Sequence, residues 1–231
     1  MDLSDNALGC KGLSECSSVL NDQVGTLRRL KFCNNGLSES SMEEIADILT
    51  GGKKKPVKED VSKLSQSCAA ANLTQLHFHS NSSGPGGCSP FARIIDSCTA
   101  DLTDLRFSAV RAGKEGSLIV ASALKRMGDR ILNLRHLDLT DSSFETTTSV
   151  AILADAIGLA PNLVRLNLSE CSLDDEGLKE IVTSLRKTEA PLQYFNVSGN
   201  EITAEGAKAL AEVLKVSYYV GIHVVLLLSF D

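Results

Sequence analysis

One short pattern of apolar residues recurs along this chain and constrains its fold more than any other feature. Written LxxLxLxxNxL, it occurs in full at Leu27, Leu30, Phe32, Asn35 and Leu37, and again at Leu192, Phe195, Val197, Asn200 and Ile202. Weaker copies place Asn6, Asn81, Val110, Ser142 and Cys171 at the asparagine position, which we call the asparagine slot. A pattern that returns in this way indicates a stack of similar units, each contacting its neighbours.

The spacing of the slots indicates what each unit contains. Successive slots lie 29, 46, 29, 32, 29 and 29 residues apart, so a 29-residue unit is lengthened once by 17 residues and once by 3. A unit of this length has room for a strand, a turn and an amphipathic helix. The pattern is typical of leucine-rich repeats and predicts an α/β solenoid, a horseshoe of about seven repeats. Parallel strands would line its concave face and helices its convex face.

Each slot is followed by a segment with helical periodicity. After Ile202, apolar residues recur three and four positions apart, and Thr203 is suited to cap the helix. The expected helices span residues 203–215, 174–186, 145–158, 114–127, 87–98, 39–50 and 10–20. The slot asparagines have a structural role in this interpretation, because an inward-facing amide can bond the backbone of the turn that leaves each strand.

The repeats define one domain over residues 1–215 that begins within a unit. Because a solenoid needs a terminal cap, this start predicts that the chain is a fragment. The 17 extra residues predict a polar insertion on the rim at about residues 50–71, interrupted by Pro56. Its lysines, at positions 53–55 and 58, are interpreted as solvated surface, with contact to an acidic partner as the alternative.

Residues 216–231 lack the repeat pattern and are predicted to lie outside the solenoid. They are too short and too interrupted for a membrane span of about 20 apolar residues. Val216 and Ser217, directly after Lys215, are what a common splice-donor sequence encodes in frame, so this tail is interpreted as translated intron. A spliced transcript that continues with another repeat after Lys215 would confirm this. A genuine apolar C-terminal strand or anchor is the alternative.

Composition and charge exclude several classes of function. The formal net charge is −6, and neither half of the chain has the basic footprint of a nucleic-acid-binding protein. The seven cysteines form no CxxC pair or regular framework, so we expect reduced structural thiols and a cytoplasmic protein. No targeting pattern opens the chain, and we expect a monomer without a membrane span.

Two phrases resemble a known family. Leu3–Gly9 (LSDNALG) and Phe32–Leu37 (FCNNGL) begin 29 residues apart and precede the lysine-rich insertion. They look like consecutive repeats of the Ran GTPase-activating protein family, which is similar to ribonuclease inhibitor in shape. The resemblance implies an activator of the Ran GTPase that supports nucleocytoplasmic transport, in the cytoplasm or at the cytoplasmic side of the nuclear envelope. It also implies no active site or cofactor of its own, because the partner would bind GTP and Mg²⁺.

Asn34 is the candidate residue for this activity. In the family, the first asparagine of the Asn-Asn-Gly phrase helps to hold the GTPase's own catalytic glutamine, without an arginine finger, and Asn34 has that position here. The corresponding residues of the other units are Asp5, Ser80, Ala109, Asp141, Glu170 and Gly199. The three acidic residues predict a rim that faces basic residues on the GTPase, with a solvated edge as the alternative. Lys31, pointing out of the core on the concave face, is a further candidate contact.

Other functions are kept as alternatives. A leucine-rich-repeat scaffold that only binds proteins would share this architecture. An enzyme in its own right lacks support, because no acid, base and nucleophile converge in the sequence. His77 and His79 have metal-binding side chains, but no third ligand accompanies them. They are interpreted as hydrogen-bonded histidines, and no metal site is predicted.

Overall fold

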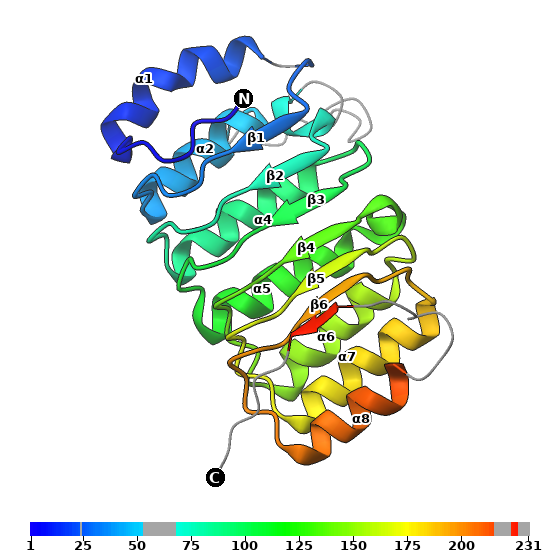
Figure 1. The fold of residues 1–231 in the computed structure, drawn as a ribbon. Coiled ribbons are helices and arrows are strands. Elements are labelled where there is room, and N and C mark those ends of the chain that lie inside the picture. Colours follow the sequence, from blue (N-terminus) through cyan, green and yellow to red (C-terminus); the bar gives the residue numbers. More distant parts are fainter. Residues whose placement is uncertain (24, 53–67, 215–222, 226–231) are drawn as a thin grey trace.

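The computed structural model describes residues 1–23, 25–52, 68–214 and 223–225. Its strands form one parallel sheet in chain order (Figure 1). They are β1 (Arg29–Lys31), β2 (Gln75–His77), β3 (Asp104–Arg106), β4 (His136–Asp138), β5 (Arg165–Asn167), β6 (Tyr194–Asn196) and β7 (His223–Val225). Paired residues of adjacent strands are separated by the same 46, 29 or 32 positions as the slots, so each unit stays aligned with the next despite the inserted lengths. Before β1, Asp2 forms a parallel bridge with Lys31.

A helix follows nearly every strand and covers one face of the sheet (Figure 1). The helices are α1 (Gly9–Asp22), α2 (Glu39–Thr50), α4 (Cys88–Ser97), α5 (Gly113–Arg126), α6 (Thr147–Gly158), α7 (Asp175–Thr188) and α8 (Ala204–Leu214). Short 3₁₀ turns lie at η1 (Ala69–Asn72), η2 (Pro85–Gly87) and η3 (Gly128–Asn133). The predicted solenoid, with a parallel sheet on one face and helices on the other, is confirmed.

Local sequence explains where several helices begin. A side-chain oxygen accepts a hydrogen bond from the first turn at α2, α6 and α7, supplied by Ser38, Thr146 and Asp174 respectively. At α8, Thr203 Oγ1 accepts from the Glu205 N–H at 3.2 Å, as the sequence predicts. Such caps satisfy N–H groups that have no partner within the helix and are each worth about 1 kcal/mol.

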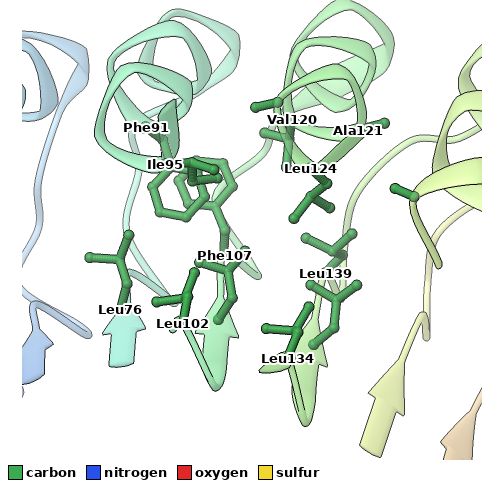
Figure 2. Close-up of a cluster of buried hydrophobic side chains, with 14 of the residues drawn as sticks. Leu76, Phe91, Ile95, Leu102, Phe107, Val120, Ala121, Leu124, Leu134 and Leu139 are labelled. Atoms are coloured by element: carbon green, nitrogen blue, oxygen red, sulfur yellow. The ribbon is translucent and has the colours of Figure 1, made fainter. Parts of the chain in front are cut away.

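The core lies between the sheet and the helices. Figure 2 shows Phe107, just after β3, facing Phe91 of α4 in a layer of leucines. The two rings stack with centroids 3.9 Å apart. Phe78 and Phe32 extend this row toward the N-terminus, with successive centroids 5.9 and 5.6 Å apart. All four rings are fully buried, and each such burial contributes about 1.5–3 kcal/mol, so the row joins three consecutive units into one continuous core.

Asn200 shows the structural role of the slot residues. Its Oδ1 accepts hydrogen bonds from the backbone N–H groups of Cys171 and Leu173, at 2.9 and 3.0 Å. Its Nδ2 donates to the carbonyls of Leu168 and Val197, both at 2.8 Å. The side chain is buried, so this one amide satisfies four backbone groups that would otherwise lack partners.

The same arrangement recurs toward the N-terminus. Asn81 Oδ1 accepts from the N–H groups of Asn35 and Leu37, and its Nδ2 donates to the Phe32 carbonyl at 2.6 Å. Asn35 Oδ1 in turn accepts from the Asn6 N–H at 3.1 Å. The slot asparagines therefore form a ladder between units, and their predicted structural role is confirmed.

At the C-terminal end the structure supports the alternative of an apolar C-terminal strand over a tail outside the solenoid. Residues 216–231 were expected outside the solenoid, yet β7 pairs with β6 in the register of the repeats. Tyr194 is opposite His223, again 29 positions later. The apolar composition of the tail concealed this strand, because the tail lacks the polar residues that alternate in other units. The remainder of the tail and most of the insertion at 50–71 lie outside the described residues, and the intron interpretation stays a prediction.

Candidate functional site

The residue before each asparagine slot has the same unusual backbone conformation. Its φ is positive in every unit: Asp5 59°, Asn34 52°, Ser80 57°, Ala109 52°, Asp141 58°, Glu170 54° and Gly199 68°. Glycine, and less often asparagine or aspartate, adopts this left-handed conformation readily. We call this row of residues, at the ends of the strands, the strand-end edge. The turn accepts serine, alanine and glutamate here as well, so the backbone does not require an amide at Asn34.

The Asn34 side chain is exposed and fixed by its neighbour. Its Nδ2 donates a hydrogen bond to Asp5 Oδ1 at 3.0 Å. Its backbone N–H donates to the His79 carbonyl at 3.0 Å, which holds the residue against the next unit. A shallow depression surrounds it, lined by Asp5, Asn6, Ala7, Gly9, Asn34, Asn35 and Gly36. Asn34 thus presents an oriented amide on an open surface that a partner can reach.

The predicted acidic residues lie on the strand-end edge but not in one continuous line. Asp141 and Glu170 occupy adjacent units and line a second depression, together with Arg111. Asp5 lies four units before Asp141, which corresponds to about 19 Å at the usual strand spacing. Ser80 and Ala109 separate the two groups. The acidic residues therefore form two separate patches. Asp5 lies beside Asn34, whereas Asp141 and Glu170 lie together in later units.

Lys31 occupies a different surface from the other candidates. It lies on β1 and faces the concave side, where it is half-buried. Its Nζ is 3.3 Å from Asp2 Oδ2, and this ion pair links β1 to the N-terminal segment that lies beside it. A partner would contact Lys31 only by reaching over the concave face.

Sequence reasoning missed a charged cluster at the centre of the concave face. Asp104 is buried there, and its Oδ1 lies 3.0 Å from His77 Nε2 and 2.9 Å from Arg106 Nε. His136 Nδ1 is 3.5 Å from the other carboxylate oxygen. Burial alone would raise the pKa of Asp104, but hydrogen bonds from His77 and Arg106 hold it well below its usual range. The signal was present only in the register of three adjacent strands, which pairs residues 29 and 32 positions apart in the sequence.

Cys33 and His79 form a second polar pair on this face. Burial raises the pKa of the Cys33 thiol, but hydrogen bonding to His79 outweighs it and lowers the pKa below its ordinary value. The pKa of His79 is raised by the same bond. The two histidines considered as metal ligands thus have separate partners, Asp104 and Cys33. Among the described residues, no group of three potential ligands gathers around one point.

Ion pairs link neighbouring units on the helical face. Arg93 of α4 contacts Glu43 and Asp47 of α2, at 3.0 and 2.9 Å. Arg126 and Asp96 repeat the arrangement one unit later, at 2.9 Å. Of the helices that the structure describes, none has the length and apolar character needed to cross a membrane.

Comparison with known proteins agrees with this architecture. The Leucine Rich repeat family pattern matches residues 160–182 and 190–211, which contain β5 and β6 and the beginnings of the helices that follow them. The described sheet and helices thus have the fold of a leucine-rich-repeat solenoid. The two matched segments have the same register, slot geometry and helix placement as the units before them, so the repeat extends through the described sheet.

Three relatives show the range of proteins that this leucine-rich-repeat chain resembles. RAN GTPase-activating protein 2 of Arabidopsis thaliana is 31% identical over 102 residues, which cover 43% of this chain and 18% of that protein. Mouse ribonuclease inhibitor is 26% identical over 93% of this chain and 42% of its own length. Human NACHT, LRR and PYD domains-containing protein 3 is 25% identical over 93% of this chain and 21% of its own. The chain thus spans less than half of each relative.

Proposed function

We propose that this leucine-rich-repeat protein accelerates GTP hydrolysis by a Ran-type GTPase. The observation that carries the proposal is the exposed Asn34 amide, which is hydrogen-bonded to Asp5. Asn34 belongs to the repeat whose sequence resembles repeats of the Ran activators. The similarity to RAN GTPase-activating protein 2 supports the same assignment. The protein would act in the cytoplasm, including the cytoplasmic side of the nuclear envelope, and support nucleocytoplasmic transport.

The hydrogen bond to Asp5 decides how Asn34 can act. Because Nδ2 is engaged with the carboxylate, Oδ1 is the atom directed to a partner. An amide oxygen accepts hydrogen bonds, so it can hold the side-chain N–H of the GTPase glutamine that orients the attacking water. Asn34 would therefore position a group of the partner rather than react itself. GTP and Mg²⁺ would belong to the GTPase, and this chain would contribute no cofactor.

The acidic residues of the strand-end edge have a separate part in the proposal. Asp141 and Glu170 are exposed and lie beyond Asn34 along the same edge. Carboxylates at the rim of an interface mainly increase the association rate and fix the orientation of a basic partner. They would guide the GTPase to the edge, where Asn34 then contacts it.

A protein-binding scaffold without effect on GTP hydrolysis is the second candidate. The observation favouring it is the extent of the matches to ribonuclease inhibitor and to the NACHT protein, which cover 93% of this chain. Both candidates use the same solenoid, and the fold alone does not choose between them.

The test is single-turnover GTP hydrolysis by Ran in the presence of the full chain. The variants are Asn34→Ala and, as the matched control at the same left-handed position one unit later, Ser80→Ala. Circular dichroism first establishes that each protein is folded. We expect acceleration by the wild type and by the control, and its loss in Asn34→Ala. A folded wild type that binds Ran without accelerating hydrolysis would support the scaffold instead.

A further inference from the structure

The opposite edge of the sheet carries four exposed arginines. Arg28 and Arg29 lie at the start of β1, Arg135 directly before β4, and Arg165 at the start of β5. We call the row of residues at the beginnings of the strands the strand-start edge. Among the described residues, none of these four arginines has a carboxylate within ion-pair distance, although Arg28 donates one hydrogen bond to the Gly25 carbonyl at 3.4 Å.

These arginines contrast with several cations of the helical face. There, Arg93, Arg126 and Lys125 each contact a carboxylate of a neighbouring helix, at 2.6 to 3.0 Å. The protein is acidic overall, with a formal net charge of −6, so carboxylates are abundant. Exposed arginines without a carboxylate partner in such a protein are available to a binding partner.

Arg165 is prepared for binding by its neighbour. Its guanidinium carbon lies 4.3 Å from the ring centroid of Tyr194, at the start of the adjacent strand. Stacking on an aromatic face orients the guanidinium and leaves its N–H groups along the ring edge, where they can donate to a carboxylate. The free side chain therefore loses less conformational freedom on binding than an isolated surface arginine would.

The two edges of the sheet differ in the sign of their exposed charges. Asp104 begins β3 in the same row as Arg29 and Arg165, but it is buried and already paired with His77 and Arg106. The strand-start edge also includes two carboxylates in the preceding loops, Asp101 and Glu189, but four arginines outnumber them. The strand-end edge has the opposite sign. A partner lying along the strand-start edge must therefore be acidic.

We propose that the strand-start edge binds an acidic protein segment that spans from Arg29 to Arg165. Four strand spacings separate β1 from β5, or about 19 Å, which matches roughly six residues of extended chain or a helix of about 13 residues. Two carboxylates at this separation would contact the β1 arginines and the β4–β5 arginines together. The inference does not rest on the proposed GTPase function, because it concerns the other edge of the sheet.

A nucleic acid is a poorer occupant of this edge. Its phosphate backbone would lie beside Asp101 and Glu189, within a protein of negative net charge. Base stacking needs free aromatic faces, and Tyr194 already stacks with Arg165. The carboxylates of a short acidic segment can be spaced to avoid the acidic loops, which a continuous phosphate backbone cannot.

The test measures binding of a fluorescein-labelled peptide of about 13 residues, mostly glutamate, to the full chain by fluorescence anisotropy. The variant is Arg29→Gln with Arg165→Gln. The matched control is Arg186→Gln with Lys187→Gln, which removes the same charge from exposed positions at the end of α7. Circular dichroism establishes that both variants are folded. A single-stranded oligothymidine of equal charge serves as competitor.

We expect the Arg29/Arg165 variant to bind the peptide at least about fivefold more weakly than wild type, and the control to bind within about twofold. Added salt should weaken wild-type binding. Equal weakening in the control, or no binding by the folded wild type, would overturn the proposal. Tighter binding of the oligothymidine with the same arginine dependence would overturn it in favour of a nucleic acid.

Discussion

Asn34 and Asp5 occupy equivalent positions in consecutive units, and the Asn34 Nδ2 donates to the Asp5 Oδ1 at 3.0 Å. Both residues are left-handed, with φ of 52° and 59°. One side chain thus combines two properties that can be separated experimentally. Its residue type suits the backbone conformation, and its amide is oriented by the preceding unit toward a partner.

Replacing Asn34 with glycine or alanine separates these properties. Both variants lack the amide, so both should lose the acceleration of GTP hydrolysis by Ran. Their stabilities should differ, because alanine at positive φ costs about 1 kcal/mol that glycine avoids. Urea unfolding measures the free-energy difference, and single-turnover hydrolysis measures the activity. Activity that persists in Asn34→Gly would show that the amide is not the positioning group.

The asparagine ladder predicts a graded loss of stability along the chain. Asn200 is buried and bonds four backbone groups, so Asn200→Ala should lower the free energy of unfolding by about 2–4 kcal/mol. Asn6 is exposed, and its amide bonds only the Leu3 and Ser4 carbonyls. Asn6→Ala should therefore cost less than about 1 kcal/mol, because water can replace the lost partners. Equal costs in urea unfolding would contradict the structural role assigned to burial of the slot.

Much of this fold could be predicted because each unit encodes its own strand, slot and helix. The left-handed position before the slot was not predicted, although Asp5, Asn34, Asp141 and Gly199 are residue types that suit that conformation. The Asp104 cluster could not be read in the same way. It depends on pairing across gaps of 29 and 32 residues, so its members are neighbours only once the register is fixed.

β7 was missed for a different reason. Its register follows the 29-residue spacing, but the segment has no slot asparagine and no alternation of polar residues. The 29-residue spacing alone is consistent with a strand here, but the sequence prediction followed the composition and left the tail outside the solenoid. In a solenoid, the backbone of the preceding strand offers hydrogen-bond partners to any β-forming segment that arrives at the right distance.

The acidic residues at the strand-end edge should control how fast the GTPase binds. Asp141→Asn with Glu170→Gln should reduce the association rate with Ran several-fold at low salt and flatten its salt dependence. The control is Glu180→Gln with Glu212→Gln, which removes the same charge from exposed positions on α7 and α8. Stopped-flow measurements give the association rate of each variant with Ran, and the control should keep the wild-type rate. An unchanged rate in the first variant would show that this edge is only solvated.

The buried carboxylate of Asp104 should make stability depend on pH in a defined range. Its pKa is lower in the folded protein than its ordinary value of 3.8, so the ionised form stabilises the fold above that pH. The contribution is lost as pH falls below 3.8 through the folded pKa. Asp104→Asn should therefore reduce the free energy of unfolding by about 1–3 kcal/mol at neutral pH, and by less in acid. A deficit that is equal at pH 7 and pH 3 in urea unfolding would exclude this role.

Two helical glycines should respond oppositely to alanine. At Gly116 of α5, an added Cβ would lie 2.6 Å from Cys88 Sγ and 3.3 Å from Pro85 Cα, so α4 and its preceding turn would have to move. We expect Gly116→Ala to cost about 1–3 kcal/mol by overpacking. At Gly158 an added Cβ would lie 3.7 Å from Ser184 Cβ of the neighbouring helix α7, which is ordinary contact. Gly158→Ala should then stabilise the protein by up to about 1 kcal/mol through helix propensity. Thermal unfolding of the two variants gives the signs directly, and stabilisation by both would mean that the units are packed less tightly at α4 and α5 than the structure shows.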